Sequence, residues 1–106
     1  MTLSEINKRL EKLIVDVPRA GKELSDTQLR IESKKSKLYL SEGCSVAKNQ
    51  EMRDAYVSER TTKEREAYAY AIGEYKKLIN ERDLLIVISA NERVIAKGSQ
   101  DGLQSS

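Results

Sequence analysis

Few side chains in this sequence can do covalent or acid–base chemistry. The 106 residues include one cysteine, Cys44, and no histidine. This inventory excludes a Ser-His-Asp or Cys-His nucleophile, a Cys/His zinc site and an internal disulfide. We expect the Cys44 thiol to be exposed in a turn and mildly activated by the helix that follows, but without a histidine beside it we expect no catalysis. The sequence therefore predicts a protein that is not an enzyme.

Pairs of carboxylates are the remaining candidates for a metal site. Glu64 lies near Glu66, and Glu51 lies near Asp54. Lys and Arg alternate with these residues at every turn, and no Glu-x-x-His pattern accompanies them. We interpret them as surface residues, and we expect neither a metal nor another cofactor.

Long helices must position the remaining features, because the chain contains only one Pro and five Gly. Thr2 and Glu5 form a capping box that starts the first helix. Apolar residues then recur in steps of three and four along one seam. Pro18 interrupts this seam, so the first element is either one kinked helix over about 3–41 or two helices over about 3–16 and 19–41.

A turn at Gly43, with the glycine in the left-handed conformation, separates this element from a second helix. Ser45 or Asn49 can cap that helix, which we expect over about 46–97. Residues 98–106 are predicted to be a disordered tail. The predicted fold is all-α, with a single helical domain over 1–97. It forms an antiparallel two-helix hairpin that resembles a coiled coil, or a three-helix arrangement if Pro18 breaks the first helix.

Five consecutive apolar residues, Leu84 to Ile88, cover every side of the second helix for more than one turn. The run is also β-prone, but no second strand-like segment exists to pair with it, so helix is favoured. A hairpin partner buries about a third of a helix's circumference, so another surface must cover the rest. Either a homodimer, a third helical layer or a protein partner would do so. The predicted patch consists of Leu13, Ile14, Leu84, Leu85, Ile86, Val87 and Ile88.

Two further candidate surfaces lie near the turn. In the first, aromatic rings with polar tips face one another and form an anchor for a protein partner or a clamp on the turn. This protein-binding tip comprises Tyr39, Met52, Tyr56, Lys35 and Lys48. The second is a basic strip at helical spacing, formed by Arg30, Lys34 and Lys37. Three acidic residues of the second helix, Glu51, Asp54 and Glu59, are expected to face the strip. A solvated, salt-bridged surface is therefore favoured over nucleic-acid binding.

The charge balance and the apolar content limit the remaining partners. A formal net charge of +2 gives no global basic field of the kind that nucleic-acid binders show. No stretch reaches the roughly 18 apolar residues of a membrane span, and the charged N-terminus is unlike a signal peptide. We therefore expect a cytoplasmic protein with a reduced thiol and no membrane partner.

The residues around the turn resemble those of a group of small phage and prophage proteins. The resemblance is carried by Ser41-Glu42-Gly43 and by Ala47-Lys48-Asn49-Gln50-Glu51-Met52-Arg53-Asp54-Ala55-Tyr56. In that group a first helix ends, a short Gly-Lys-Asn-x-Glu-x-Arg-x-Ala-like segment turns the chain, and a long charged helix returns. The proteins belong to early regions that handle replication, recombination or host takeover.

This resemblance implies an accessory protein of the host cytoplasm. Such a protein would bind, and modulate or inhibit, a host or phage complex with a nuclease, replication or defence role. It implies no catalytic residue. Two alternatives remain open: a nucleic-acid-associated factor that uses the basic strip, and a structural coiled-coil subunit.

Overall fold

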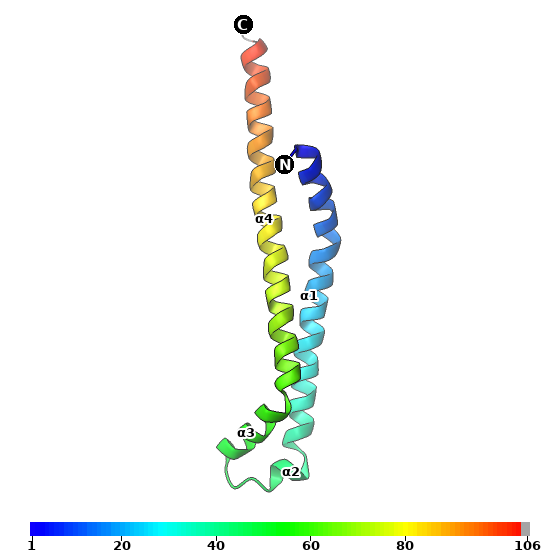
Figure 1. Ribbon diagram of the computed structural model, residues 1–106, viewed down its shortest axis with the longest axis vertical. Coiled ribbons are helices and arrows are strands. Elements are labelled where there is room, and N and C mark those ends of the chain that lie inside the picture. The colour runs from blue at the N-terminus through cyan, green and yellow to red at the C-terminus, as the bar shows by residue number, and fades with distance from the viewer. Residues whose placement is uncertain (105–106) are drawn as a thin grey trace. The chain divides into compact units, whose positions relative to one another are not determined.

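The computed structural model describes the backbone of residues 1–104 and the side chains of residues 1–97. It contains four helices, α1 (Leu3–Tyr39), α2 (Glu42–Ser45), α3 (Gln50–Arg60) and α4 (Thr62–Gln104) (Figure 1). The described residues include no strand, so the predicted all-α class is confirmed, and the β-prone run at 84–88 is helical. The packing divides the chain into two units. Unit 1 combines Met1–Arg19 with the chain from Lys76 onward, and unit 2 is Ala20–Tyr75.

The first helix begins at the predicted capping box. The Thr2 hydroxyl accepts a hydrogen bond from the Glu5 backbone N–H at 3.2 Å and donates one to the Glu5 carboxylate at 3.1 Å. α1 then continues through Pro18 to Tyr39, so the version with two helices over 3–16 and 19–41 is wrong. Pro18 is exposed, and its missing N–H removes only one bond from a helix that both flanking segments continue.

Unit 1 is held together by the facing sides of α1 and α4, which run in opposite directions within it (Figure 1). Ile6 and Leu13 on α1 are fully buried, and Leu85 on α4 is nearly so. The Arg9 guanidinium bridges to the Glu81 carboxylate in a two-pronged ion pair, with an Nη2–Oε2 distance of 2.7 Å. Such a fork fixes the register of the two helices.

Unit 2 contains the end of α1, both short helices and the start of α4. Its buried side chains are Thr27, Ile31, Cys44, Val57, Thr61 and Ala71. The Lys34 ammonium lies 2.6 Å from the Glu64 carboxylate and joins α1 to α4. The ring of Tyr75 reaches to 3.4 Å from the position a Cβ would take on Gly21. The ring of Tyr75, on α4, therefore lies against α1 within unit 2.

The chain between α1 and α4 differs from the predicted simple turn. Gly43 lies inside α2, and no described glycine has a positive φ. The predicted helix over 46–97 is also wrong, because it is divided into α3 and α4 at Thr61. The Thr61 hydroxyl donates to the Val57 carbonyl at 2.9 Å, in place of a backbone amide that would continue the helix.

The final helix extends further than predicted. α4 continues past 97 to Gln104, because the glycines at 98 and 102 lower helix propensity without ending the helix. The disordered tail was expected at 98–106. Its residues 98–104 belong to α4, and residues 105–106 lie outside the described part of the chain.

Candidate protein-binding tip

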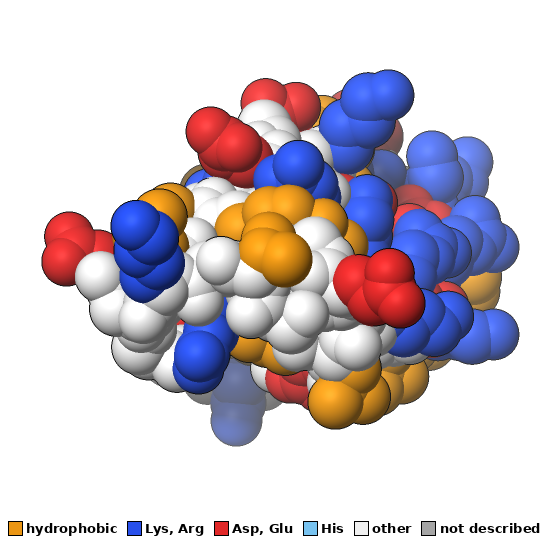
Figure 2. Space-filling model, turned by 90° about the horizontal axis from the view of Figure 1, so that it is seen from below, with side chains coloured by type: hydrophobic (Ala, Val, Ile, Leu, Met, Phe, Trp, Pro, Cys, Tyr) orange, Lys and Arg blue, Asp and Glu red, His pale blue; other side chains and the backbone are white. Residues whose placement is uncertain are grey.

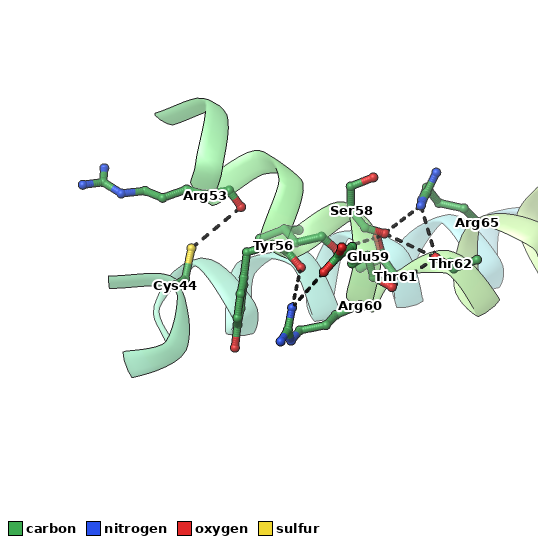
Figure 3. A network of polar contacts seen from close by, with 10 residues as sticks. Cys44, Arg53, Tyr56, Ser58, Glu59, Arg60, Thr61, Thr62 and Arg65 are labelled. Atoms are coloured by element: carbon green, nitrogen blue, oxygen red, sulfur yellow. Dashed lines mark hydrogen bonds and ion pairs between the residues drawn. The ribbon is translucent and has the colours of Figure 1, made fainter. Parts of the chain in front are cut away.

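The tip of unit 2, residues 39–61, is built around the contact between α2 and α3. The Tyr56 ring lies over Gly43, where an added Cβ would come within 2.8 Å of the ring carbon Cζ. Cys44 is fully buried beside it, and its thiol points to the Arg53 carbonyl at 4.0 Å (Figure 3). The expectation of an exposed thiol is therefore wrong, because α2 turns Cys44 inward against α3. Glycine at 43 allows the two helices to approach.

Polar side chains fix the ends of these short helices. Ser41 caps α2 by accepting from the Cys44 backbone N–H at 3.3 Å. Of the two caps considered for the second helix, Asn49 is the one used, and its side chain accepts from the Met52 N–H at 2.8 Å. Each cap satisfies a backbone donor that would otherwise lack a partner, so it sets where the helix begins.

A hydrogen bond ties the end of α1 to α3. The Tyr39 hydroxyl donates to the Asp54 carboxylate at 2.6 Å, and the Gln50 amide donates to the same oxygen at 2.8 Å. These two donors lower the pKa of Asp54, and the Tyr39 bond has the larger effect. The same bond raises the pKa of the Tyr39 phenol, because ionised Tyr39 could no longer donate to the carboxylate.

Two arginines cover the break between α3 and α4. The Arg60 guanidinium lies 3.6 Å from the centre of the Tyr56 ring and donates to the Tyr56 carbonyl at 3.2 Å. Arg65 reaches back to the Ser58 carbonyl at 2.6 Å (Figure 3). Tyr56, predicted as an anchor for a partner, is thus half-buried and holds the tip together.

The outer face of the tip carries exposed apolar side chains. Leu40 is 89% exposed and Val46 is 79% exposed, while Met52 and Tyr39 are about half as exposed. Figure 2 views the molecule from this end and shows hydrophobic side chains among the polar ones, with Lys and Arg gathered to one side.

Four of the five residues predicted for this surface are exposed, namely Tyr39, Met52, Lys35 and Lys48. Leu40 and Val46 were missed, although Leu40 follows the end of the first helix and Val46 lies in the connection, where neither serves the helical seam. Large apolar residues that lie off the helical seam were the sequence signal that could have identified Leu40 and Val46.

The basic strip lines an open groove with Leu29, Ser33 and Glu64. Its central residue, Lys34, forms an ion pair with Glu64, and this ion pair lowers the pKa of the Glu64 carboxyl. Arg30 lies 3.9 Å from Glu23. The strip is therefore partly neutralised, by partners other than the acidic residues of 51–59 that were expected to face it.

The predicted apolar patch is only partly exposed. Leu13 and Leu85 are core residues, so their assignment to the patch is wrong: both lie where α1 and α4 face one another in unit 1. The remaining members are accessible, with Ile14, Leu84, Ile86 and Val87 exposed and Ile88 half-buried.

Among the described residues no three Asp, Glu or Cys side chains come together as metal ligands would. Within the same residues, none of the helices combines the length and apolar content that crossing a membrane requires. No family model, curated protein or solved structure matches the chain.

Proposed function

We propose that this chain is a non-enzymatic accessory protein that binds another protein through its tip. The observation that carries the proposal is the exposure of Leu40 and Val46 on a segment that buried and capped residues hold in place. A connection between antiparallel helices needs only about two to eight residues. The longer, internally packed connection found here presents apolar side chains to solvent at no benefit to its own core.

The resemblance of residues 41–56 to phage and prophage proteins supports the class of partner. On that basis the target is a host or phage complex with a nuclease, replication or defence role in the host cytoplasm. Binding there would modulate or inhibit the complex, because the tip supplies contact area and no reactive group.

The test compares two matched variants as baits in a host lysate. Leu40→Ser with Val46→Ser removes the apolar contacts of the tip, whereas Leu29→Ser changes an equally apolar, exposed residue on α1 away from it. We expect a partner that wild type and Leu29→Ser both retain and that the tip variant loses. Equal retention by all three proteins would place the binding surface elsewhere.

The basic strip favours a second candidate, binding to nucleic acid. Arg30, Lys37 and Lys63 line adjoining grooves on unit 2, so phosphate contacts are sterically open. Pairing of Lys34 with Glu64 makes this candidate the weaker one. Affinity for single- and double-stranded DNA across a salt series decides it, since phosphate neutralisation imposes a steep slope that Lys37→Glu would reduce.

We further propose that α1 and α4 form one coiled-coil-like antiparallel hairpin and that the chain is a homodimer. The hairpin is supported by an ion pair between α1 and α4 within each unit, Arg9–Glu81 in unit 1 and Lys34–Glu64 in unit 2. The homodimer is supported by the exposed apolar residues of α4. If the tip binds no partner, a purely structural coiled-coil role remains for such a dimer.

A further inference from the structure

α4 extends beyond the helix that packs against it in unit 1. Because the helices run in opposite directions and Arg9 pairs with Glu81, α1 begins beside about residue 87 of α4. Figure 1 shows the N-terminus beside the middle of this part of α4, which continues past it. Every residue from Ala90 to Lys97 is exposed. A helical segment without tertiary packing is only marginally stable in water, so we expect another helix or protein surface to pack against this segment.

Four large, exposed apolar side chains of α4 share one side of this helix, two of them within this segment and two in the turns before it. Leu84, Val87, Val94 and Ile95 are each between 56% and 70% exposed. Positions 84, 87, 91 and 94 are separated by three, four and three residues, which is the spacing of a coiled-coil seam. We call the five residues Leu84, Val87, Asn91, Val94 and Ile95 the outer seam.

The outer seam points away from the interior of unit 1. At about 100° per residue, its centre lies roughly 140° around the helix from Leu85 and Ser89, which face α1 and are buried. Ile86, also exposed, lies off the seam on another side of the helix. A second helix could therefore occupy the seam without displacing α1.

Asn91 identifies what that second helix is. An apolar partner would bury its amide without a hydrogen bond, which is unfavourable. Two copies of α4 aligned in parallel place Asn91 against the same residue of the second copy, where the two amides satisfy one another. An antiparallel pair brings the two Asn91 amides together only in the single register whose two-fold axis passes through them. The seam and its neighbour Ala90 carry no charge, so parallel copies bring no like charges together.

We propose that the outer seam is the surface on which a second copy of this chain docks, as a parallel coiled coil of two α4 helices. The inference rests on the proposed homodimer and names its surface and direction. The outer seam includes no residue of α1 or of the tip.

The first experiment measures the dimer dissociation constant of the full chain by sedimentation equilibrium, for wild type, Val87→Asp and Ile86→Asp. The two variants place the same charge on neighbouring exposed residues of one helix. Val87→Asp should raise the dissociation constant by about 100-fold or more, as loss of an interface hot spot does. Ile86→Asp should leave it within a few-fold, and circular dichroism checks that both variants remain helical.

The second experiment tests direction by disulfide formation in a Cys44→Ala background. Leu84→Cys and Asn91→Cys should each link a dimer to itself under mild oxidation, because every seam position meets its own copy in a parallel pair. An antiparallel pair can link itself at one position at most, since only the residue at the two-fold axis meets its equivalent.

The possible outcomes distinguish failure of the proposed homodimer from failure of the outer seam as its interface. Monomers at every accessible concentration would overturn both the proposed homodimer and the seam. A dimer that resists Val87→Asp but is lost on Ile14→Asp would keep the homodimer and overturn the seam. Self-linking at only one of the two cysteine positions would overturn the parallel arrangement. Binding of the tip to its partner is measured independently of all three.

Discussion

At the scale of single residues, two glycines in helices have opposite relations to their surroundings. An added Cβ on Gly43 meets the Tyr56 ring, whereas one on Gly73 meets nothing within 4 Å. Helix propensity favours alanine at both positions, so the contact with Tyr56 decides whether alanine raises or lowers the free energy of unfolding. Gly43→Ala should lower the free energy of unfolding by about 1–3 kcal/mol, the cost of overpacking. Gly73→Ala should raise it by about 0.5–1 kcal/mol.

Urea denaturation followed by circular dichroism measures both changes. If Gly43→Ala were as stable as Gly73→Ala, the close approach of α2 and α3 would not exist in solution.

The hydrogen bond from Tyr39 to Asp54 makes the stability of the tip depend on pH. Because the folded pKa of Asp54 lies below its unfolded value, the bond contributes stability above a pH of about 4 and loses it as the pH falls through the folded value. Tyr39→Phe removes the donor. Wild type should therefore be more stable than Tyr39→Phe at neutral pH, and the difference should shrink in acid.

The raised pKa of Tyr39 sets the upper end of the pH range in which the bond stabilises the fold. The contribution of the bond to stability is present below a pH of about 10 and is lost above it. Tyr70→Phe is the matched control, because the Tyr70 side chain is 73% exposed. A pH-independent difference between wild type and Tyr39→Phe would show that the bond to Asp54 does not form.

At the scale of elements, α1 tolerates a proline in its interior. Replacing Pro18 by alanine restores an N–H that can bond to the Ile14 carbonyl and removes a steric clash. We expect Pro18→Ala to raise the free energy of unfolding by up to about 3 kcal/mol. Thermal denaturation should show a higher midpoint than for Lys22→Ala, a change at an exposed neighbouring site. A lower midpoint would indicate that the native backbone at this position favours proline.

Local sequence signals predicted the elements that depend on local interactions. The Thr2–Glu5 box and the cap at Asn49 both follow from side chains within one turn. The helical state of residues 84–88 followed instead from the lack of a second strand-like segment, because the run itself is β-prone. α2 could not be predicted in this way. It exists because Tyr56 packs over Gly43 and Cys44 is buried, and these contacts join residues on two different helices.

The surfaces were harder to predict than the helices. The run of five apolar residues at 84–88 correctly indicated that one partner helix could not cover every side of the last helix, but it did not show which members α1 covers. Leu85 faces α1, and its neighbours Leu84 and Ile86 do not. Similarly, the spacing of Arg30, Lys34 and Lys37 identified a basic strip, whereas its partner Glu64 emerges only from the register of α1 against α4. Burial and pairing therefore depended on register, which composition does not fix.

At the scale of the whole molecule, assembly and folding draw on different residues of α4. Residues 90–97 are exposed on every side and contribute no buried side chain to unit 1. Truncation after Ser89 removes these residues, including the seam members Asn91, Val94 and Ile95, and retains the buried core of both units. The truncated chain should therefore fold as a monomer.

The measurement is the thermal midpoint at several protein concentrations. Dimerisation that favours the folded chain makes the midpoint of the full chain rise with concentration, by mass action. After truncation the midpoint should become independent of concentration and should match that of Val87→Asp in the full chain. A truncated protein that failed to fold at any concentration would show instead that the end of α4 is required within a single chain. The tip is built from residues 39–61, which the truncation retains. Its binding to a partner should therefore survive the truncation, whichever surface forms the dimer.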